Sequence, residues 1–93
     1  MTLAELRKYK PQILEMAARA GISNIRVFGS LARGENNPRD VDFLVTLGPK
    51  ISWDFFGFAE EASALLKCKV DVLPDNIKKP SLRQNVEQEA VPL

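Results

Sequence analysis

The sequence predicts a small α/β domain of the α+β kind, built from helices that alternate with short strands. Apolar residues recur at helical spacing through the first twenty positions and again in residues 51–67. Three short apolar stretches, residues 24–28, 40–47 and 68–74, have the length and composition of strands. The 93 residues contain neither a linker nor an internal repeat, so we expect a single domain over residues 1–93.

The first helix is expected between a start signal at Thr2 and a stop signal at Gly21. Thr2 and Glu5, three positions apart, form a capping box, and a glycine commonly ends a helix. Pro11 lies inside this segment, and an internal proline removes a backbone hydrogen bond. We therefore expect either a kink or two short helices joined at Lys10.

The remaining elements are predicted by similar signals. The strand of residues 24–28 leads into Gly29 and Ser30, after which residues 31–34 can form about one helical turn. The Asn and Pro content of "ENNP", residues 35–38, indicates a loop. The later elements are a strand of residues 40–47, a helix of residues 51–67 capped by Ser52, a strand of residues 68–74 ended by Pro74, and a helix of residues 81–91 with Ser81 and Gln84 as a second capping box.

Charge and residue content exclude several classes of function. Thirteen basic and twelve acidic residues leave a net charge of +1, so no broad electrostatic field collects nucleic acid or anionic lipid. The absence of histidine excludes histidine-based triads and histidine zinc sites. The single cysteine, Cys68, cannot form an internal disulfide, and we interpret it as a packing residue of a protein in the reducing cytoplasm. No stretch has the length of a membrane span, and the N-terminus lacks the apolar core of a signal peptide.

Three aspartates are predicted to share one face of a sheet. Residues two apart in a strand point to the same side, so Asp40 and Asp42 face away from the apolar residues between and after them. Asp71 has the same placement in the strand "KVDVL", and pairing of the two strands would bring the three carboxylates together. A divalent cation relieves the mutual repulsion of such carboxylates, and hard oxygen ligands suit Mg²⁺. The aspartates are therefore candidate magnesium ligands.

Gly29 and Ser30 lie on a turn that can receive phosphate groups. A glycine lets the backbone approach a phosphate closely, amides at a helix start favour anions, and a serine hydroxyl adds a directed hydrogen bond. Arg33, one helical turn further on, could add a charge-assisted bond to the same phosphates, or it could be a solvated residue or part of an internal salt bridge. A Gly-Ser pair or an Asp-x-Asp pair alone is usually structural, but their joint occurrence favours a site for a metal-bound triphosphate.

The motifs "GSLARGE", "DVDFLV", "KVDVL" and "KKPSLRQNVEQEAVPL" together resemble those of the minimal nucleotidyltransferases, the short branch of the DNA polymerase beta superfamily. The resemblance extends from about residue 25 to residue 93. It implies the nucleotidyltransferase fold, a small mixed sheet with helices mainly on one face and the acidic site on the other. It assigns Gly29 and Ser30 to triphosphate binding, and Asp40, Asp42 and Asp71 to catalysis and to two Mg²⁺ ions.

The resemblance also implies an activity and a partner. The expected reaction transfers a nucleoside monophosphate, AMP from ATP, to a hydroxyl group, and the acceptor is expected on another chain because no segment remains to bind it. Small members of the family are commonly encoded beside a helical HEPN-domain protein, usually a ribonuclease toxin, and act as its antitoxin. Some of them add AMP to a tyrosine hydroxyl of that partner.

Two other functions stay open, as does the assembly of the protein. One is a binding antitoxin that neutralises its partner by occlusion, and the other is a nucleotidyltransferase for a small alcohol. The sequence determines neither the nucleotide nor the acceptor residue. It also leaves open whether the protein forms a homo-oligomer or a hetero-oligomer.

Two aromatic residues fall outside the apolar stripe of the helix expected at residues 51–67. On a helical wheel Trp53 lies nearly opposite the stripe and Phe56 well to one side. These rings could pack beneath the "NNPR" loop or the last helix. They could equally contact a partner or the nucleotide base, because tryptophan is enriched at interface hot spots and bases stack on aromatic rings. The stripe itself consists of Ile51, Phe55, Phe58, Ala59, Ala62, Leu65 and Leu66.

Overall fold

The computed structural model describes residues 1–35, 40–50 and 52–93 of the chain. Most of the expected "ENNP" loop and Ile51 of the apolar stripe lie outside the described residues. The helices and strands follow one another as α1 (Leu3–Arg7), α2 (Lys10–Ala20), β1 (Ile22–Phe28), β2 (Asp40–Leu47), α3 (Asp54–Leu66), β3 (Lys69–Pro74), α4 (Pro80–Glu89) and β4 (Val91–Pro92). In the described part of the chain no helix combines the length and the apolar character needed to cross a membrane.

The first two helices form as two separate elements around Pro11. Thr2 caps α1 by accepting a hydrogen bond from the N–H of Glu5 at 3.1 Å. Pro11 lies in the first turn of α2, where a missing N–H leaves no helical hydrogen bond unmade. Of the two expected arrangements, the chain therefore adopts two short helices, the second beginning at Lys10. α2 ends as predicted at Gly21, which has a left-handed φ of 79°.

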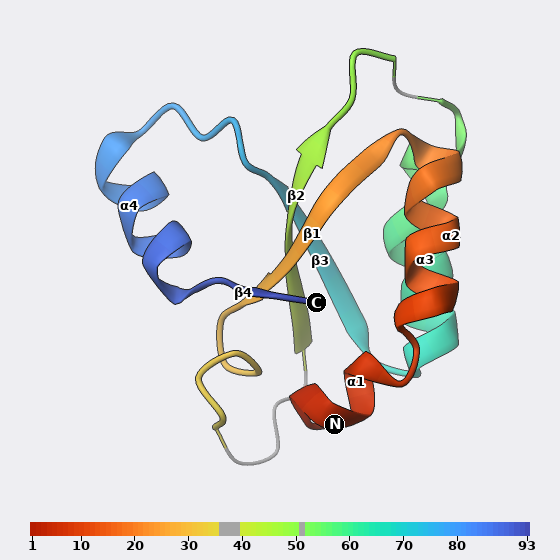
Figure 1. Ribbon diagram of the computed structural model, residues 1–93, viewed down its shortest axis with the longest axis horizontal. Coiled ribbons are helices and arrows are strands. Elements are labelled where there is room, and N and C mark those ends of the chain that lie inside the picture. Colours follow the sequence, from red (N-terminus) through yellow and green to blue (C-terminus); the bar gives the residue numbers. More distant parts are fainter. Residues whose placement is uncertain (36–39, 51) are drawn as a thin grey trace.

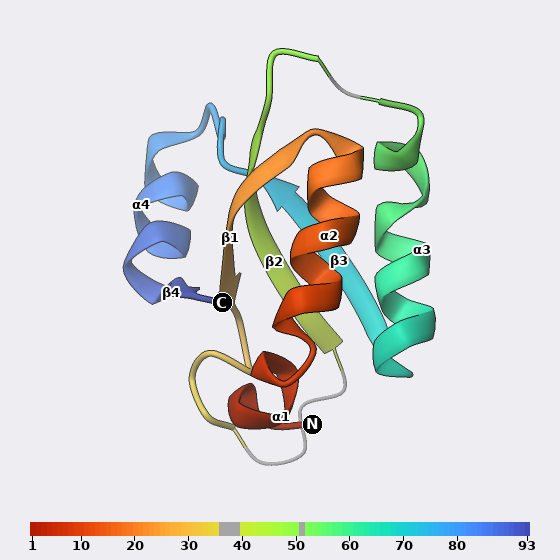
Figure 2. The ribbon, with the colours of Figure 1, turned by 45° about the vertical axis from the view of Figure 1, so that its right-hand side comes forward.

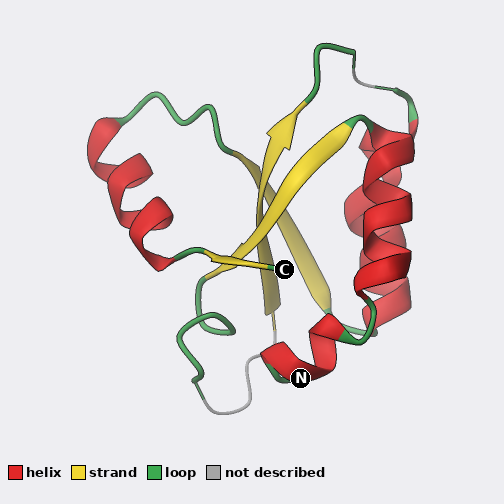
Figure 3. Cartoon of the chain, viewed as in Figure 1, coloured by secondary structure: helices red, strands yellow, loops and turns green. Residues whose placement is uncertain are grey.

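The strands of the described chain form one mixed sheet in the order β3-β2-β1-β4. β1 is antiparallel to both β2 and β4, whereas β2 and β3 are parallel. Figures 1 and 2 show α2 and α3 side by side on one face of this sheet and α4 on the other. The resulting helix–sheet–helix layers are also visible in Figure 3. The predicted mixed sheet, with its helices mainly on one face, is confirmed.

The main hydrophobic core lies between the sheet and the layer of α2 and α3. Val41 and Phe43 point from β2 into this core and are almost completely buried. Phe43 meets Phe58 of α3, with the two ring centroids 6.4 Å apart. Because alternate residues of a strand face opposite sides, this packing fixes Asp40 and Asp42 on the other face of the sheet.

The start of α3 differs from the predicted one. The helix begins at Asp54, and the residue before it, Trp53, provides no side-chain cap. The predicted cap, Ser52, is wrong because its hydroxyl donates a hydrogen bond to the carbonyl oxygen of Arg19 in α2. The serine therefore links two helices instead of starting one.

The predicted capping box of α4 is also wrong. The helix begins at Pro80, one residue before Ser81, and Lys79 precedes it without a side-chain hydrogen bond. Proline is well suited to the first position of a helix, because its fixed φ is already helical. The helix ends at Glu89 and does not continue to residue 91 as expected.

The strand β4 was not among the predicted elements. It pairs with β1 opposite Arg26 and Val27, and the N–H of Leu93 donates to the carbonyl oxygen of Ile25 at 3.2 Å. A two-residue strand offers no periodicity to detect, and its proline argues against a strand. The pairing brings the end of α4 to the end of β1.

Residues 31–34 form a hydrogen-bonded turn and not a regular helix. The N–H of Arg33 donates to the carbonyl oxygen of Gly29 at 3.1 Å, which closes a single turn of helical spacing. Gly34 then adopts a left-handed φ of 72° and ends the turn. The expected single turn after Ser30 is present in this form.

Candidate functional site

The turn that follows β1 lies directly against one of the predicted carboxylates. Gly29 has a φ of 78°, a backbone conformation that residues with a side chain rarely adopt. A Cβ atom added to Gly29 would lie 2.4 Å from Oδ2 of Asp42, well inside van der Waals contact. Glycine is therefore needed both for the backbone conformation and for the approach of Asp42. Ser30 is the next residue of the turn and is partly buried.

The three predicted aspartates lie at neighbouring positions on one face of β2 and β3. Asp40 and Asp42 are separated by Val41, which is buried on the opposite face. Asp71 is the direct partner of Asp42 in the parallel pairing of β2 with β3, and Asp40 is opposite Lys69. Asp42 is therefore flanked by Asp71 on one side and by the end of β1 on the other.

Asp42 occupies a position that disfavours an ionised carboxylate. Partial burial has the largest effect and raises the pKa of Asp42 above its ordinary value. The negative charges of Asp71, Asp40 and Glu89 raise this pKa further. Lys69 acts in the opposite direction, and its Nζ lies 3.8 Å from Oδ2 of Asp71. A cation bound at Asp42 would relieve this excess of negative charge.

The aspartates fit a hard divalent cation in the chemistry of their donor atoms, because carboxylate oxygens are the ligands that Mg²⁺ prefers. Within residues 1–35, 40–50 and 52–93, no three acidic, histidine or cysteine side chains are placed so that they could hold a metal ion together. The strands align the backbone of Asp40, Asp42 and Asp71 without converging their oxygens on one point. Rotation of the side chains would be needed to bring them to a common ion.

Arg33, which was predicted to contact phosphates, pairs with two carboxylates of the chain itself. Its Nε donates to Oε2 of Glu35 at 2.6 Å, and its Nη1 donates to Oε1 of Glu89. These hydrogen bonds, first that to Glu35 and then that to Glu89, raise the pKa of Arg33 above its ordinary value. The internal salt bridge that the sequence left open is therefore present, on a side chain that is half exposed.

Glu89 is a residue of this site that the sequence did not indicate. Its Oε2 accepts a hydrogen bond from the N–H of Gly29 at 3.3 Å, while its Oε1 binds Arg33. Glu89 and Gly29 are 60 residues apart in sequence and meet because β4 pairs with β1. The motif "KKPSLRQNVEQEAVPL" contains Glu89, but its contact with the turn depends on the tertiary pairing of the short apolar tail "AVPL".

The two aromatic residues that fell outside the helical stripe are exposed. Trp53 is 89% and Phe56 73% exposed, so neither packs beneath the last helix. Their ring centroids are 5.8 Å apart. Phe56 also lines a pocket of about 280 Å³ between α3 and β3, to which Asp71 and Val72 contribute from the strand. Phe56 thus lies beside the strand that carries Asp71.

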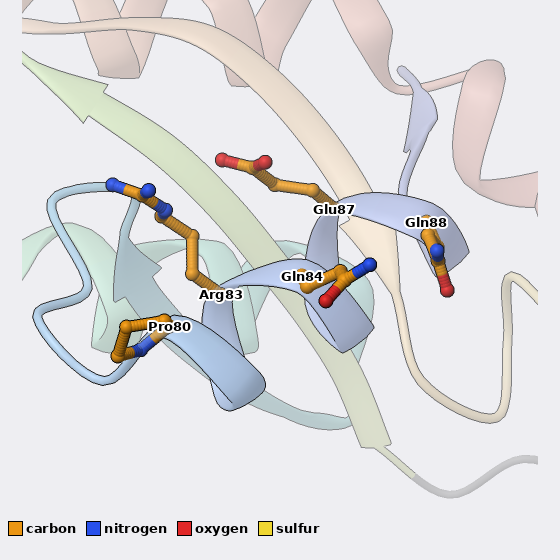
Figure 4. A pocket seen from close by; sticks show the side chains of 5 residues that line it. All are labelled: Pro80, Arg83, Gln84, Glu87 and Gln88. Carbon is orange, nitrogen blue, oxygen red and sulfur yellow. The ribbon is translucent and has the colours of Figure 1, made fainter.

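A second pocket, of about 470 Å³, lies on α4 and is lined by that helix alone. Figure 4 shows that Arg83 and Glu87 extend from the same side of the helix. The lining contains none of the predicted site residues. It consists of Pro80, Arg83, Gln84, Glu87 and Gln88.

Comparison with solved structures finds similar folds. A candidate minimal nucleotidyltransferase is 36% identical and has a TM-score of 0.82, with 100% of this chain and 97% of that chain covered. A toxin–antitoxin crystal structure with AMP-PNP is 18% identical with a TM-score of 0.70, covering 89% of this chain and 70% of the other. The toxin–antitoxin MntA–HepT is 16% identical with a TM-score of 0.64, covering 92% and 69%. No curated protein matches the sequence.

The family of this chain can be assigned from its sequence. The model of the nucleotidyltransferase domain family matches residues 6–93, which is nearly the whole chain and includes every element from α2 to β4. The 36% identity over the full length of a solved structure points in the same direction. The chain therefore belongs to the nucleotidyltransferase domain family.

Proposed function

We propose that this protein transfers the AMP moiety of ATP to a hydroxyl group of a HEPN-type partner protein in the cytoplasm, and that it acts as the antitoxin of that partner. The proposal rests on the close approach of Gly29 to Asp42, which puts a turn suited to phosphates beside a carboxylate suited to a cation. Similarity of fold to a toxin–antitoxin bound to AMP-PNP, and to MntA–HepT, supports both the nucleotide and the kind of partner.

The turn would bind the triphosphate, and the carboxylates would bind the metal ions that accompany it. The amide of Gly29 and the hydroxyl of Ser30 donate hydrogen bonds to oxygens of the triphosphate. Asp40, Asp42 and Asp71 would hold two Mg²⁺ ions, which would neutralise the phosphate charge and lower the pKa of the acceptor hydroxyl. The two groups lie close enough to hold one nucleotide, because Asp42 contacts the turn itself.

The reaction is a displacement at the α-phosphorus of ATP. The acceptor oxygen forms a bond to the α-phosphorus, the bond to the oxygen that bridges to the β-phosphate breaks, and pyrophosphate leaves. Asp71, whose side chain is 55% exposed, takes the proton of the acceptor hydroxyl. The turn holds the leaving phosphates in place, so that the acceptor attacks from the opposite side.

Substitution of Asp42 by asparagine tests this activity. Wild type and Asp42→Asn are incubated with ATP, Mg²⁺ and the HEPN-type protein encoded by the neighbouring open reading frame, and the mass of the partner is measured. The wild type should add adenylate and the variant should add none. Because the folded chain raises the pKa of Asp42, its ionised form weakens stability at neutral pH, so Asp42→Asn should be at least as stable as wild type without Mg²⁺.

Asp54→Asn is the matched control, because it removes an exposed carboxylate at the start of α3 and should leave transfer unchanged. The proposed activity is wrong if the wild type adds no nucleotide to the partner from any of the four ribonucleoside triphosphates. If Asp42→Asn fails to fold, the prediction that Asp42 is needed for nucleotidyl transfer but not for folding is wrong.

The exposed aromatic pair Trp53 and Phe56 favours a second function, neutralisation by binding alone. Large aromatic side chains at the surface are typical of the hot spots at which proteins bind one another. Under this alternative, Asp42→Asn would neutralise the partner in cells as well as wild type does. Under the proposed enzymatic function, the variant would bind the partner without neutralising it.

A further inference from the structure

In the structure, a carboxylate of the chain itself already binds the amide of Gly29, which the proposed function assigns to phosphate, and Arg33, which the sequence offered as a further phosphate contact. Glu89 is the last residue of α4. One of its oxygens accepts a hydrogen bond from the N–H of Gly29 at 3.3 Å, and the other accepts a hydrogen bond from Nη1 of Arg33. A backbone amide at a glycine turn and an arginine beside it are the groups that bind phosphate oxygens in many proteins. Glu89 presents to them the same kind of charged oxygen atoms.

The position of Glu89 is set by the fold and not by a local sequence contact. Two residues after Glu89, β4 pairs with β1 opposite Arg26 and Val27. Arg7 of α1 fixes the same segment, since its Nη2 donates to the carbonyl oxygen of Pro92 at 2.8 Å. The rest of α4 is loosely attached, because Val86 is its only buried residue. The anchored tail therefore carries Glu89 to the turn.

The contact has an electrostatic cost that a purely structural salt bridge would not need. Glu89 lies close enough to Asp42 for its charge to disfavour ionisation of that aspartate. Its side chain is 27% exposed, whereas that of Arg33 is 50% exposed. A negative group is thus held at the edge of an already acidic site, at the point where the phosphates of a nucleotide would enter.

We infer that Glu89 is an internal substitute for phosphate, which holds the Gly29 turn and Arg33 in place without nucleotide and competes with the triphosphate for both. The inference rests on the proposed function, because it deepens the role of the same turn. Binding of a triphosphate requires Glu89 to leave the amide of Gly29, and this departure also releases Nη1 of Arg33 for the incoming phosphates. Glu89 is therefore a residue that limits affinity for the nucleotide.

The experiment measures binding of inorganic tripolyphosphate in the presence of Mg²⁺ by titration calorimetry, with the amide signal of Gly29 followed by NMR. Glu89→Gln should bind tripolyphosphate more tightly than wild type, on the order of tenfold, because the competing charge is removed. Glu89→Asp keeps the charge but is one methylene too short to reach both donors, so its gain should be smaller. Glu87→Gln removes an exposed charge from the same helix and should change affinity by less than about twofold.

A double-mutant cycle with Arg33→Met separates this inference from a general effect of charge. The gain from Glu89→Gln should shrink in the Arg33→Met background, because the released arginine no longer contributes to phosphate binding. Unchanged or weaker tripolyphosphate binding by Glu89→Gln, in a variant whose other amide signals match wild type, overturns the inference. So does the absence of binding in all variants. Tripolyphosphate has no nucleoside and needs no acceptor, so failure of nucleotidyl transfer to the partner is a separate result.

Discussion

Gly29 and Gly34 share a backbone conformation but differ in their surroundings. Their φ angles are 78° and 72°, both in the left-handed region that favours glycine. A Cβ atom at Gly29 would meet the carboxylate of Asp42, whereas at Gly34 it would meet no atom of the residues that the structure describes within 4 Å. The two positions therefore separate the effect of backbone strain from the effect of displacing Asp42.

Gly29→Ala and Gly34→Ala should each lower the free energy of unfolding by roughly 1–2 kcal/mol, the cost of a left-handed conformation for a residue with a side chain. Only Gly29→Ala should also abolish nucleotidyl transfer, because its methyl group forces the Asp42 carboxylate out of place. Chemical denaturation and the transfer assay measure the two effects. Equal activity of the two variants would show that the contact with Asp42 has no role in the reaction.

Asp75 is an acidic residue whose environment differs from that of Asp42. It accepts hydrogen bonds from the hydroxyl of Thr46 at 2.5 Å and from Nη2 of Arg26 at 2.9 Å. The bond from Thr46 has the largest effect, and together with Arg26 it lowers the pKa of Asp75 below its ordinary value despite partial burial. This cluster joins the end of β3 to β1 across β2.

Asp75→Asn should lower the free energy of unfolding at neutral pH by about 1–2 kcal/mol, as expected for loss of a charged hydrogen-bond acceptor. Because the pKa of Asp75 is lower in the folded than in the unfolded chain, its contribution is complete above the unfolded value, about 3.9, and is lost as the pH falls through the folded value. The stability difference between wild type and variant should therefore begin to shrink below about pH 4 and vanish only below the folded value. Urea denaturation at pH 7 and pH 3 measures this, and a constant difference would contradict it.

At the scale of elements, the sequence predicted those features that depend on local periodicity. The alternation around Asp40 and Asp42 placed both carboxylates opposite the buried face of β2, and the structure has this arrangement. The predicted cap at Ser52 is wrong, because its hydroxyl binds a carbonyl 33 residues away, a contact that the local sequence does not reveal. Glu89 was missed for the same reason, since its contact with Gly29 requires β4, a strand defined only by its pairing with β1.

Trp53, which directly precedes α3, is predicted to contact the partner. Trp53→Ala should change the free energy of unfolding by less than about 0.5 kcal/mol, because the side chain is 89% exposed. It should weaken binding to the proposed HEPN-type partner by on the order of 2 kcal/mol. Phe58→Ala, a buried residue of the same helix, is the contrasting control and should cost about 3–5 kcal/mol of stability. Unchanged partner affinity of Trp53→Ala would place the interface elsewhere.

For the molecule as a whole, the core and the acidic site lie on opposite faces of one sheet. The core between the sheet and the layer of α2 and α3 contains most of the buried apolar residues. The other face carries the aspartates and is covered only in part by α4, of which a single residue is buried. Changes at the site should therefore alter ligand binding more than they alter folding.

Under the proposed function, magnesium should raise the melting temperature of the whole domain, because the aspartates would bind it only when the strands bring them to one face. At a concentration about ten times its Kd the gain is about 1.4 kcal/mol, or roughly 6–11 °C for a domain of this size. ATP together with magnesium should raise it further. Thermal melting at fixed ionic strength tests this, with Asp42→Asn as control, and equal effects of sodium and magnesium would contradict a metal site.

The exposure of Trp53 also determines which events its fluorescence can report. It is the only tryptophan of the chain, and its indole is in contact with solvent in the folded protein much as it would be in the unfolded one. Its emission maximum should hardly move when the domain unfolds, so denaturation is better followed by circular dichroism of the backbone. A protein that covers α3 would exclude water from the same ring and shift the emission to the blue. The fluorescence of this single indole should therefore report the formation of a complex and should change little when the domain folds.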